Sequence, residues 1–263
     1  SVMAGVCYSS AMERPMTLWS LRPAGEHAGL RRAAQGAGLR LRALPQQRLA
    51  ARADDASRRA LEAALEAPIR VYTSPAAVRF AARLAGGGAG LVRPGIDVAV
   101  GAGTAGALGA LGARDVHHPA RMDSEGALAL PALRVPAGTP VGLVTAPGGR
   151  GLLAATLRER DAALRVADVY ERRPVRGGAR ARAALLADRS GVLLASSAES
   201  IALLLERLPG RASRSGLALR ARGVVASSAR LAGHLRAAGF ATVVEAESAR
   251  PEALVAAALA MRP

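Results

Sequence analysis

The feature that most restricts the fold of this chain is a repeated alternation of short apolar segments with longer segments rich in Ala, Leu and Arg. Strands that alternate with helices favour a parallel sheet, because neighbouring parallel strands need a crossover connection. The sequence therefore predicts an α/β fold with parallel sheets flanked by helices. The expected strands are TLWSL (17–21), LRLRAL (39–44), IRVYT (69–73), DVAV (97–100), VGLVTA (141–146), GVLLA (191–195) and GVVA (223–226).

Two segments interrupt this alternation. Residues 45–53, PQQRLAARA, are polar and extended, and residues 164–174, LRVADVYERRP, are long for a strand of this chain and end at a proline. With 263 residues, the chain has room for two domains of ordinary size. We interpret the two segments as connectors between two domains. The glycine-rich residues 86–96 are expected to form an irregular loop.

Composition excludes several kinds of chemistry. The chain has 36 basic residues, all of them arginine, so a Schiff-base lysine and a G-K-[ST] phosphate loop are excluded. Cys7 is the only cysteine of the chain, so it cannot form an internal disulfide. With one cysteine and four histidines, the chain has few side chains suited to binding zinc. Metal and redox chemistry are therefore not expected. No apolar run approaches the ~20 residues of a membrane span. Residues 1–16 lack the pattern of a signal peptide and are expected to be a flexible leader.

The net charge of +16 suggests an anionic partner. The arginines are scattered at helical spacing, and aromatic residues, which stack on bases, make up only 2% of the chain. We therefore expect neither nucleic acid nor a membrane as partner, and an acidic small molecule fits the charge better.

Small hydroxyl residues follow several expected strands, at the beginning of the next helix. Ser74, which precedes Pro75, is expected to cap a helix that reaches about Ala85, and the pairs Ser196–Ser197 and Ser227–Ser228 occupy similar positions. Ordinary N-capping explains each serine taken singly. Several such helix ends in one cleft would bind carboxylate or phosphate through exposed N–H groups.

The segment GAGTAG (101–106) satisfies the dinucleotide motif G-x-G-x-x-G, but it lies deep in the chain. The motif also needs an acidic residue at the end of the next strand, about 20 residues later, whereas here Asp115 precedes a very short expected strand and Asp123 is expected in a loop. We interpret it as a strand-to-helix turn, with a helix from about Thr104 to Leu111, whose N–H groups and Thr104 can hold an anion. The neighbouring His117 and His118 point apart and cannot share a metal. His27 and His234 are expected at the surface.

Tyr170 is one of three tyrosines and lies in the second connector. A phenol there can donate a proton into a cleft, but from its position alone a packed core or hinge tyrosine is the favoured interpretation.

These features occur in an order that resembles the uroporphyrinogen-III synthase family. The resemblance spans nearly everything from Thr17 to the C-terminus and rests on the ordered set rather than on a single motif. The segments that carry it are residues 17–38, YTSPAAVRFAARL (72–84), VAVGAGTAGALGALGA (98–113), residues 143–174 ending in VYERRP, and VVASSARLAGHLRAAGF (224–240).

The resemblance implies two α/β lobes joined by a two-stranded extended linker. Residues 17–44 and 175–263 would form a discontinuous first lobe and residues 52–167 the second, with linker strands at 45–51 and 168–174. The implied reaction is the cyclisation of hydroxymethylbilane to uroporphyrinogen III, in which water is lost and ring D is inverted through a spiro intermediate. The resemblance thus implies a lyase of haem biosynthesis that needs no metal and no cofactor.

The resemblance also implies site residues. Tyr170 matches the family tyrosine proposed to assist departure of the hydroxyl group. The residues matched to substrate binding are Arg22, Ser74, Thr104, Gly148, Gly149, Arg150, Ser196, Ser197, Ser227, Ser228 and Arg230. Many relatives have a Gly-Pro-Thr-Thr-Ala turn where this chain has ASSARLA, which leaves the roles of the last three open.

The resemblance further implies a cytoplasmic monomer, with hydroxymethylbilane synthase as the upstream donor of substrate. The alternative is a non-catalytic two-lobed module that binds a tetrapyrrole or another polycarboxylate.

Overall fold

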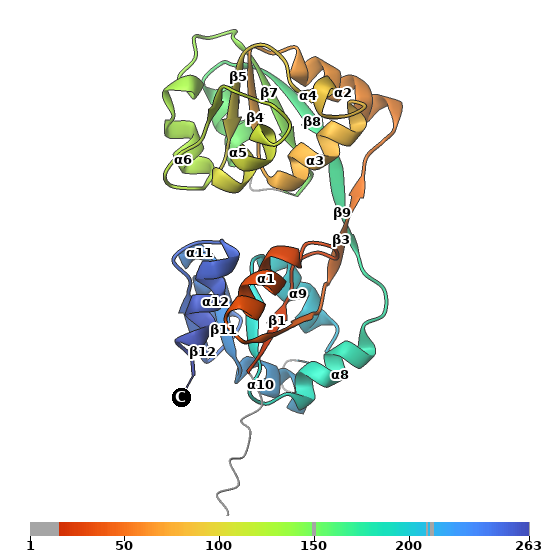
Figure 1. Ribbon diagram of the computed structural model, residues 1–263, viewed down its shortest axis with the longest axis vertical. Coiled ribbons are helices and arrows are strands. Elements are labelled where there is room, and N and C mark those ends of the chain that lie inside the picture. The colour runs from red at the N-terminus through yellow and green to blue at the C-terminus, as the bar shows by residue number, and fades with distance from the viewer. Residues whose placement is uncertain (1–15, 149–150, 209, 211–212, 263) are drawn as a thin grey trace, which may run out of the picture. The chain divides into compact units, whose positions relative to one another are not determined.

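The computed structural model describes residues 16–148, 151–208, 210 and 213–262, and its chain divides into two compact units (Figure 1). Lobe 1 denotes the residues up to Arg48 together with those from Pro174 onward, and lobe 2 denotes Leu49–Arg173. Strands β3 (Gln47–Ala51) and β9 (Tyr170–Pro174) pair in a two-stranded sheet, and both boundaries between the units fall within these strands.

Lobe 2 is built on a five-stranded parallel sheet. Its central strand is buried along its whole length, as expected of a parallel strand covered on both faces. The strands, in their order across the sheet, are β6 (Val116–His117), β5 (Ile96–Ala99), β4 (Ile69–Tyr72), β7 (Pro140–Thr145) and β8 (Ala163–Asp168).

Helices cover both faces of this sheet (Figure 1). One face carries α2 (Asp55–Leu65), α3 (Pro75–Leu84), α4 (Gly88–Leu91) and α5 (Ala102–Gly109). The other carries α6 (Ser124–Ala129), the 3₁₀ turn η1 (Pro131–Leu133) and α7 (Leu152–Glu159). The connection after β4 thus runs to one face and the connection after β7 to the other. Ligands bind to parallel sheets at such points, where the direction of the connections reverses.

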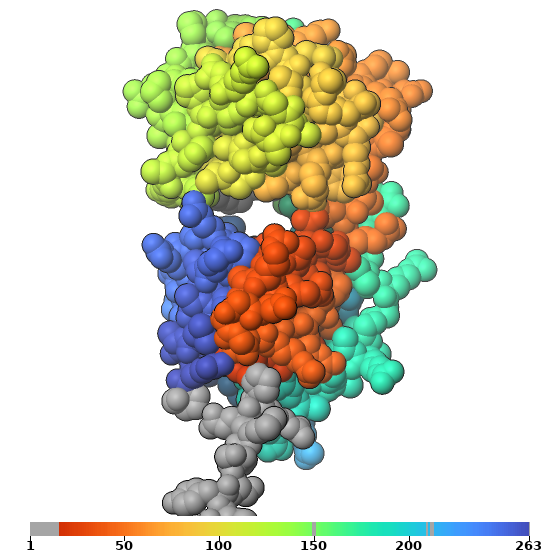
Figure 2. Space-filling model, viewed as in Figure 1, coloured from red at the N-terminus to blue at the C-terminus, as the bar shows by residue number. Residues whose placement is uncertain are grey.

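Lobe 1 has the same kind of architecture, assembled from both ends of the chain. Its parallel sheet has the order β12 (Thr242–Glu245), β11 (Gly223–Ala226), β10 (Val192–Ala195), β1 (Thr17–Ser20) and β2 (Arg40–Ala43). Helices α1 (Ala28–Gly36) and α12 (Pro251–Leu259) pack together on one face, and Figure 2 shows these N-terminal and C-terminal segments side by side. The other face carries α8 (Ala179–Ala187), α9 (Ala198–Glu206), α10 (Arg214–Arg220) and α11 (Ala229–Ala237).

Local sequence signals explain where the helices begin. Asp54 accepts a hydrogen bond from the backbone N–H of Ser57 at 2.8 Å, and Ser74 accepts one from Ala77 at 3.0 Å. Each such cap satisfies an N–H that the helix itself cannot pair, and its loss costs about 1 kcal/mol. The prediction of a Ser74 cap followed by Pro75 is confirmed.

Three sequence predictions are wrong in detail. Residues 164–174 are not one strand: β8 ends at Asp168, because its partner β7 ends at Thr145, and the chain then pairs with β3 from Tyr170 onward. The loop expected at 86–96 contains α4, whose Leu91 is buried against α3. Helix α5 begins at Ala102 rather than Thr104.

Gly142 of β7 explains how closely α2 packs on the sheet. A Cβ at this position would lie 2.1 Å from the carbonyl oxygen of Ala64 in α2. The absence of a side chain there allows helix and strand backbones to meet directly.

A buried ion pair lies between the two strands β4 and β5. The Arg70 guanidinium, with 0% of its side chain exposed, donates from Nε to Asp97 Oδ1 at 2.7 Å. Its Nη atoms donate to the backbone carbonyls of Ala67, Arg93 and Pro94. The guanidinium is thereby paired in charge and in hydrogen bonds, which a fully buried cation requires.

Within the described residues, no helix combines the length and the apolar character needed to cross a membrane.

Candidate functional site

A cavity of about 340 Å³ opens in lobe 2 at the carboxyl ends of β4 and β7. Its wall is formed by Thr73 and Ser74 after β4, Thr145 and Ala146 at the end of β7, the first turn of α7, and Tyr170 and Arg172 of β9. This is the point at which the sheet connections diverge to opposite faces. The fold therefore creates the cavity at the place where parallel sheets bind ligands.

The two polar side chains that the sequence singled out in this region meet at the cavity. The Ser74 Oγ and the Tyr170 phenol oxygen lie 3.3 Å apart, and either can be the donor. Because Ser74 Oγ also accepts the N–H of Ala77, its own hydroxyl proton is free to point toward the phenol. The pair holds the phenol in a fixed direction at the cavity wall.

The ring of Tyr170 is fixed as firmly as its hydroxyl group. It stacks on Phe80 of α3, with ring centroids 5.2 Å apart, and belongs to the apolar core between the sheet and α3. Tyr170 as a whole is only 3% exposed. Tyr170 is therefore a packed core tyrosine and a cavity residue at once, so the two interpretations left open by the sequence do not exclude each other.

Two threonines in this wall were not among the residues predicted from the sequence. Thr73 Oγ1 lies 3.0 Å from Thr145 Oγ1, and this contact links the ends of β4 and β7 beneath the cavity. Thr73 is the last residue of the predicted strand IRVYT and Thr145 the last but one of VGLVTA, and nothing in the local sequence distinguishes these positions. Arg158 of α7 and Arg172 of β9 also line the cavity and were likewise not predicted.

The other predicted residues of lobe 2 have different positions. Gly148 lines the cavity and has a φ of +79°, a conformation that favours glycine. Thr104 is buried in the first turn of α5 and does not line the cavity. Gly149 and Arg150 lie outside the described residues, as do residues 1–15 of the expected leader, including Cys7.

The predicted residues of lobe 1 gather at the carboxyl ends of its parallel strands. Ser197 caps α9 and Ser228 caps α11 through their hydroxyl oxygens, while the backbone N–H of Ser227 bonds to the carbonyl of Ala195 at 3.2 Å. Ser196 follows β10 directly, and Arg230 is exposed in the first turn of α11. The capping serine oxygens thus serve the helices on which they lie, as the simpler interpretation of each one requires.

Arg22 lies at the same end of the sheet, two residues after β1. Its Nη2 donates to the carbonyl of Ala249 at 2.9 Å. Burial lowers the pKa of Arg22, and the carboxylates of Glu26 and Glu252 oppose that effect. Part of this guanidinium is therefore committed to holding the chain before α12.

The prediction that His27 lies at the surface is wrong. His27 is 6% exposed, because it precedes α1 at a point where the chain folds back over β1. Its Nδ1 lies 2.9 Å from the hydroxyl of Ser20, and its Nε2 has no hydrogen-bond partner among the described residues. Burial, followed by the charges of Arg31 and Arg22, lowers the pKa of His27.

Replacing His27 with glutamine is expected to make the stability of the protein less sensitive to acid. Below about pH 6.5 the unfolded histidine binds a proton that the native one resists, so the free energy of unfolding of the wild type falls as the pH is lowered. Urea unfolding between about pH 7 and about pH 5 measures this slope. The exposed His234 provides the control, since His234→Gln should keep the wild-type slope. Equal slopes for His27→Gln and wild type would contradict the expectation.

Within the described residues, no group of three His, Cys, Asp or Glu side chains is placed so that it could hold a metal ion.

The fold and cavity define a two-unit α/β protein with a cavity at the ends of the parallel strands of lobe 2. Comparison with known families identifies it further: the family model described as "Uroporphyrinogen-III synthase HemD" matches residues 29–256. The chain belongs to the uroporphyrinogen-III synthase family and is therefore an enzyme of haem biosynthesis.

Solved structures share the fold. A mutant uroporphyrinogen III synthase from the extremely thermophilic bacterium Thermus thermophilus matches with a TM-score of 0.60 at 20% identity, covering 94% of this chain and 100% of that one. The uroporphyrinogen-III synthetase from Helicobacter pylori matches with a TM-score of 0.60 at 14% identity, covering 95% and 100%. Among curated protein sequences, no match was found. The expected α/β fold with two helix-flanked parallel sheets is confirmed.

Proposed function

We propose that this chain converts hydroxymethylbilane to uroporphyrinogen III, with loss of water and inversion of ring D through a spiro intermediate, and that it is a lyase. The family supports this reaction, and one geometric observation supports it within the chain. That observation is the Tyr170–Ser74 pair at 3.3 Å on the wall of the lobe 2 cavity.

The proposed role of Tyr170 is to protonate the hydroxyl group that leaves the substrate. The phenol donates its proton to the leaving oxygen as the carbon–oxygen bond breaks, and water departs. Ser74 hydrogen-bonds to the phenol oxygen and stabilises the charge that develops there. The proton released later, when the ring D carbon completes its new bond, returns to the phenolate, so the overall balance is the loss of one water.

The cavity is proposed to hold one end of the substrate rather than all of it. Its volume of about 340 Å³ is at the lower end of the roughly 300–1,000 Å³ of small-molecule sites. A linear tetrapyrrole with acetate and propionate groups on every ring is larger than such a space. Holding the reacting end in a fixed geometry is itself a large contribution to catalysis.

The hydroxyl and N–H groups at the strand ends of lobe 1 are proposed as further groups that bind substrate carboxylates. The cationic chain, with its net charge of +16, attracts such a polyanion. Substrate roles for Arg22, Thr104, Gly148, Gly149, Arg150, Ser196, Ser197, Ser227, Ser228 and Arg230 remain proposals. So do a hinge at the paired strands β3 and β9, a cytoplasmic location, a monomeric state and delivery of the substrate by hydroxymethylbilane synthase.

Isomer analysis of the product tests this function. Hydroxymethylbilane closes spontaneously to the type I isomer, whereas the proposed enzyme yields type III. A non-catalytic binding module would leave type I as the product, however tightly it bound the tetrapyrrole.

A further inference from the structure

We propose that Arg172 binds a carboxylate of the substrate beside Tyr170 and so holds the reacting end of the tetrapyrrole in the lobe 2 cavity. This inference rests on the proposed function. It assigns a role in substrate binding to a residue that the sequence did not single out.

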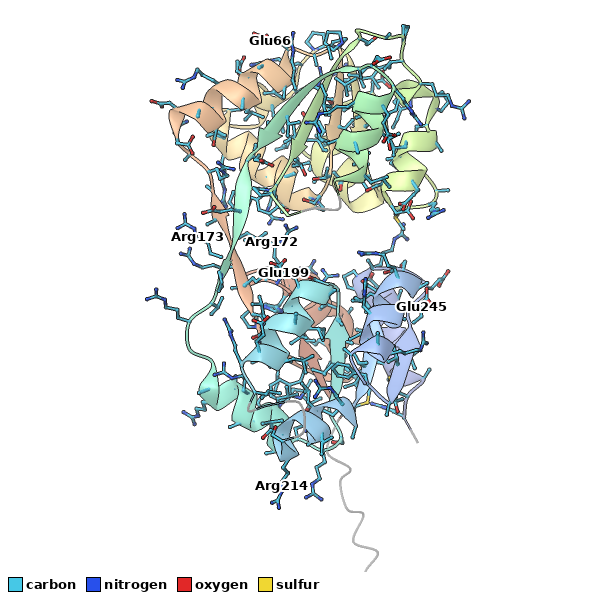
Figure 3. All side chains as sticks on the ribbon, turned by 180° about the vertical axis from the view of Figure 1, so that it is seen from behind. Glu66, Arg172, Arg173, Glu199, Arg214 and Glu245 are labelled. Carbon is cyan, nitrogen blue, oxygen red and sulfur yellow. The ribbon has the colours of Figure 1, made fainter. Side chains whose placement is uncertain are left out.

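Strand geometry places Arg172 on the same side of β9 as Tyr170, because side chains two residues apart share a side. The central guanidinium carbon of Arg172 lies 5.7 Å from the centroid of the Tyr170 ring, and both residues line the cavity. Arg173 points to the opposite side of the strand (Figure 3) and does not line the cavity. An anion held by Arg172 would therefore lie next to the phenol.

The hydrogen bonds of Arg172 leave much of its guanidinium unused. Nη1 donates to the carbonyl of Pro147 at 3.1 Å, and within the described part of the chain Arg172 has no carboxylate partner. A guanidinium has five N–H donors in a planar fork that matches a carboxylate. Arg173, by contrast, is already paired with Glu171, its Nε 2.5 Å from the carboxylate.

The bond to Pro147 also fixes the direction of the guanidinium. Pro147 lies in the connection between β7 and α7, and its neighbours Ala146 and Gly148 line the cavity. Arg172 is thus held from one side by a cavity wall and from the other by the ring of Tyr170. This preorganised cation is suited to a planar, bidentate anion rather than to a neutral part of the substrate.

The test compares Arg172→Gln with Arg173→Gln. The two variants have the same net charge and differ by one position, so a change in long-range attraction affects both equally. We expect Arg172→Gln to raise the KM for hydroxymethylbilane roughly 10–100-fold, the range for loss of a charge-assisted hydrogen-bonded pair. Arg173→Gln should leave KM unchanged. Arg172→Lys, which keeps the charge and loses the fork, should lie between Arg172→Gln and the wild type.

A second measurement needs no turnover. Uroporphyrin III bears the same eight carboxylates as the substrate, and fluorescence titration with it should give a higher Kd for Arg172→Gln than for Arg173→Gln. Thermal unfolding should show that both variants are folded.

The outcomes separate the two proposals. A wild type that yields only type I isomer overturns the proposed function. An active wild type, with Arg172→Gln matching Arg173→Gln in KM and in Kd, overturns the role of Arg172 alone.

Discussion

Replacing Asp97 with alanine is expected to lower the free energy of unfolding by about 3–5 kcal/mol. The substitution leaves the Arg70 guanidinium, whose side chain is 0% exposed, without the carboxylate that its Nε contacts at 2.7 Å. The three backbone carbonyls that remain satisfy hydrogen bonds but carry no net charge. Arg70 lies in β4, the central strand that leads to Ser74, so the loss is predicted to affect the site lobe as a whole.

Urea unfolding measures this loss, and an exposed ion pair of the same lobe provides its control. Glu62 lies 3.0 Å from Arg93 with more than half of its side chain exposed, and such pairs contribute about 0–1 kcal/mol. Glu62→Gln should therefore change the free energy of unfolding little. A loss below about 1 kcal/mol for Asp97→Ala would show that solvent or rearrangement compensates Arg70 and would refute a tightly buried pair.

Tyr170→Phe is expected to lower kcat by at least about tenfold, toward the 10²–10⁴-fold that a positioned proton donor contributes. The phenylalanine ring keeps the packing on Phe80, because the ring shape is unchanged. It removes the hydroxyl that lies 3.3 Å from Ser74 at the cavity wall. The loss of that hydrogen bond should cost only about 0.5–1.5 kcal/mol of stability. Catalysis is thus affected far more than folding.

Tyr72→Phe is the matched control for this experiment. Tyr72 is also a buried tyrosine of lobe 2, but its hydroxyl has no hydrogen-bond partner among the described residues and does not line the cavity. Removing the Tyr72 hydroxyl should leave kcat at the wild-type value. Steady-state kinetics on both variants decide the question, and an unchanged kcat in Tyr170→Phe would return Tyr170 to a purely structural role.

Much of the fold follows from local patterns in the sequence. Apolar runs such as IRVYT become buried strands, and a serine before a proline marks the beginning of α3. These features are decided within a few residues by burial and by capping. The order of strands across each sheet, in contrast, depends on contacts between distant segments. The two-sheet arrangement was predictable through the resemblance rather than through periodicity.

The sequence predictions that are wrong also concern features that depend on contacts between distant segments. His27 is buried because the segment after β1 folds over the sheet and places the ring on Ser20, a contact that helical spacing does not indicate. The break between β8 and β9 at Val169 reflects where the partner strand β7 ends. Neither the burial of His27 nor the break between the strands can be predicted from the local composition.

The candidate site was predictable in part. Ser74 and Tyr170 are 96 positions apart in the chain, and the resemblance named each of them, but only the fold shows that their oxygens meet. Thr73, Thr145 and Arg172 were missed because a threonine that ends a strand, or one arginine among 36, has no distinctive pattern.

Whether this protein is a uroporphyrinogen-III synthase is decided by the isomer composition of the uroporphyrinogen formed from hydroxymethylbilane, with protein at a small fraction of the substrate concentration. We expect the type III isomer to predominate after many turnovers per protein molecule, while heat-unfolded protein yields type I. Type I as the main product with folded protein would contradict this expectation, even if the protein bound the tetrapyrrole tightly.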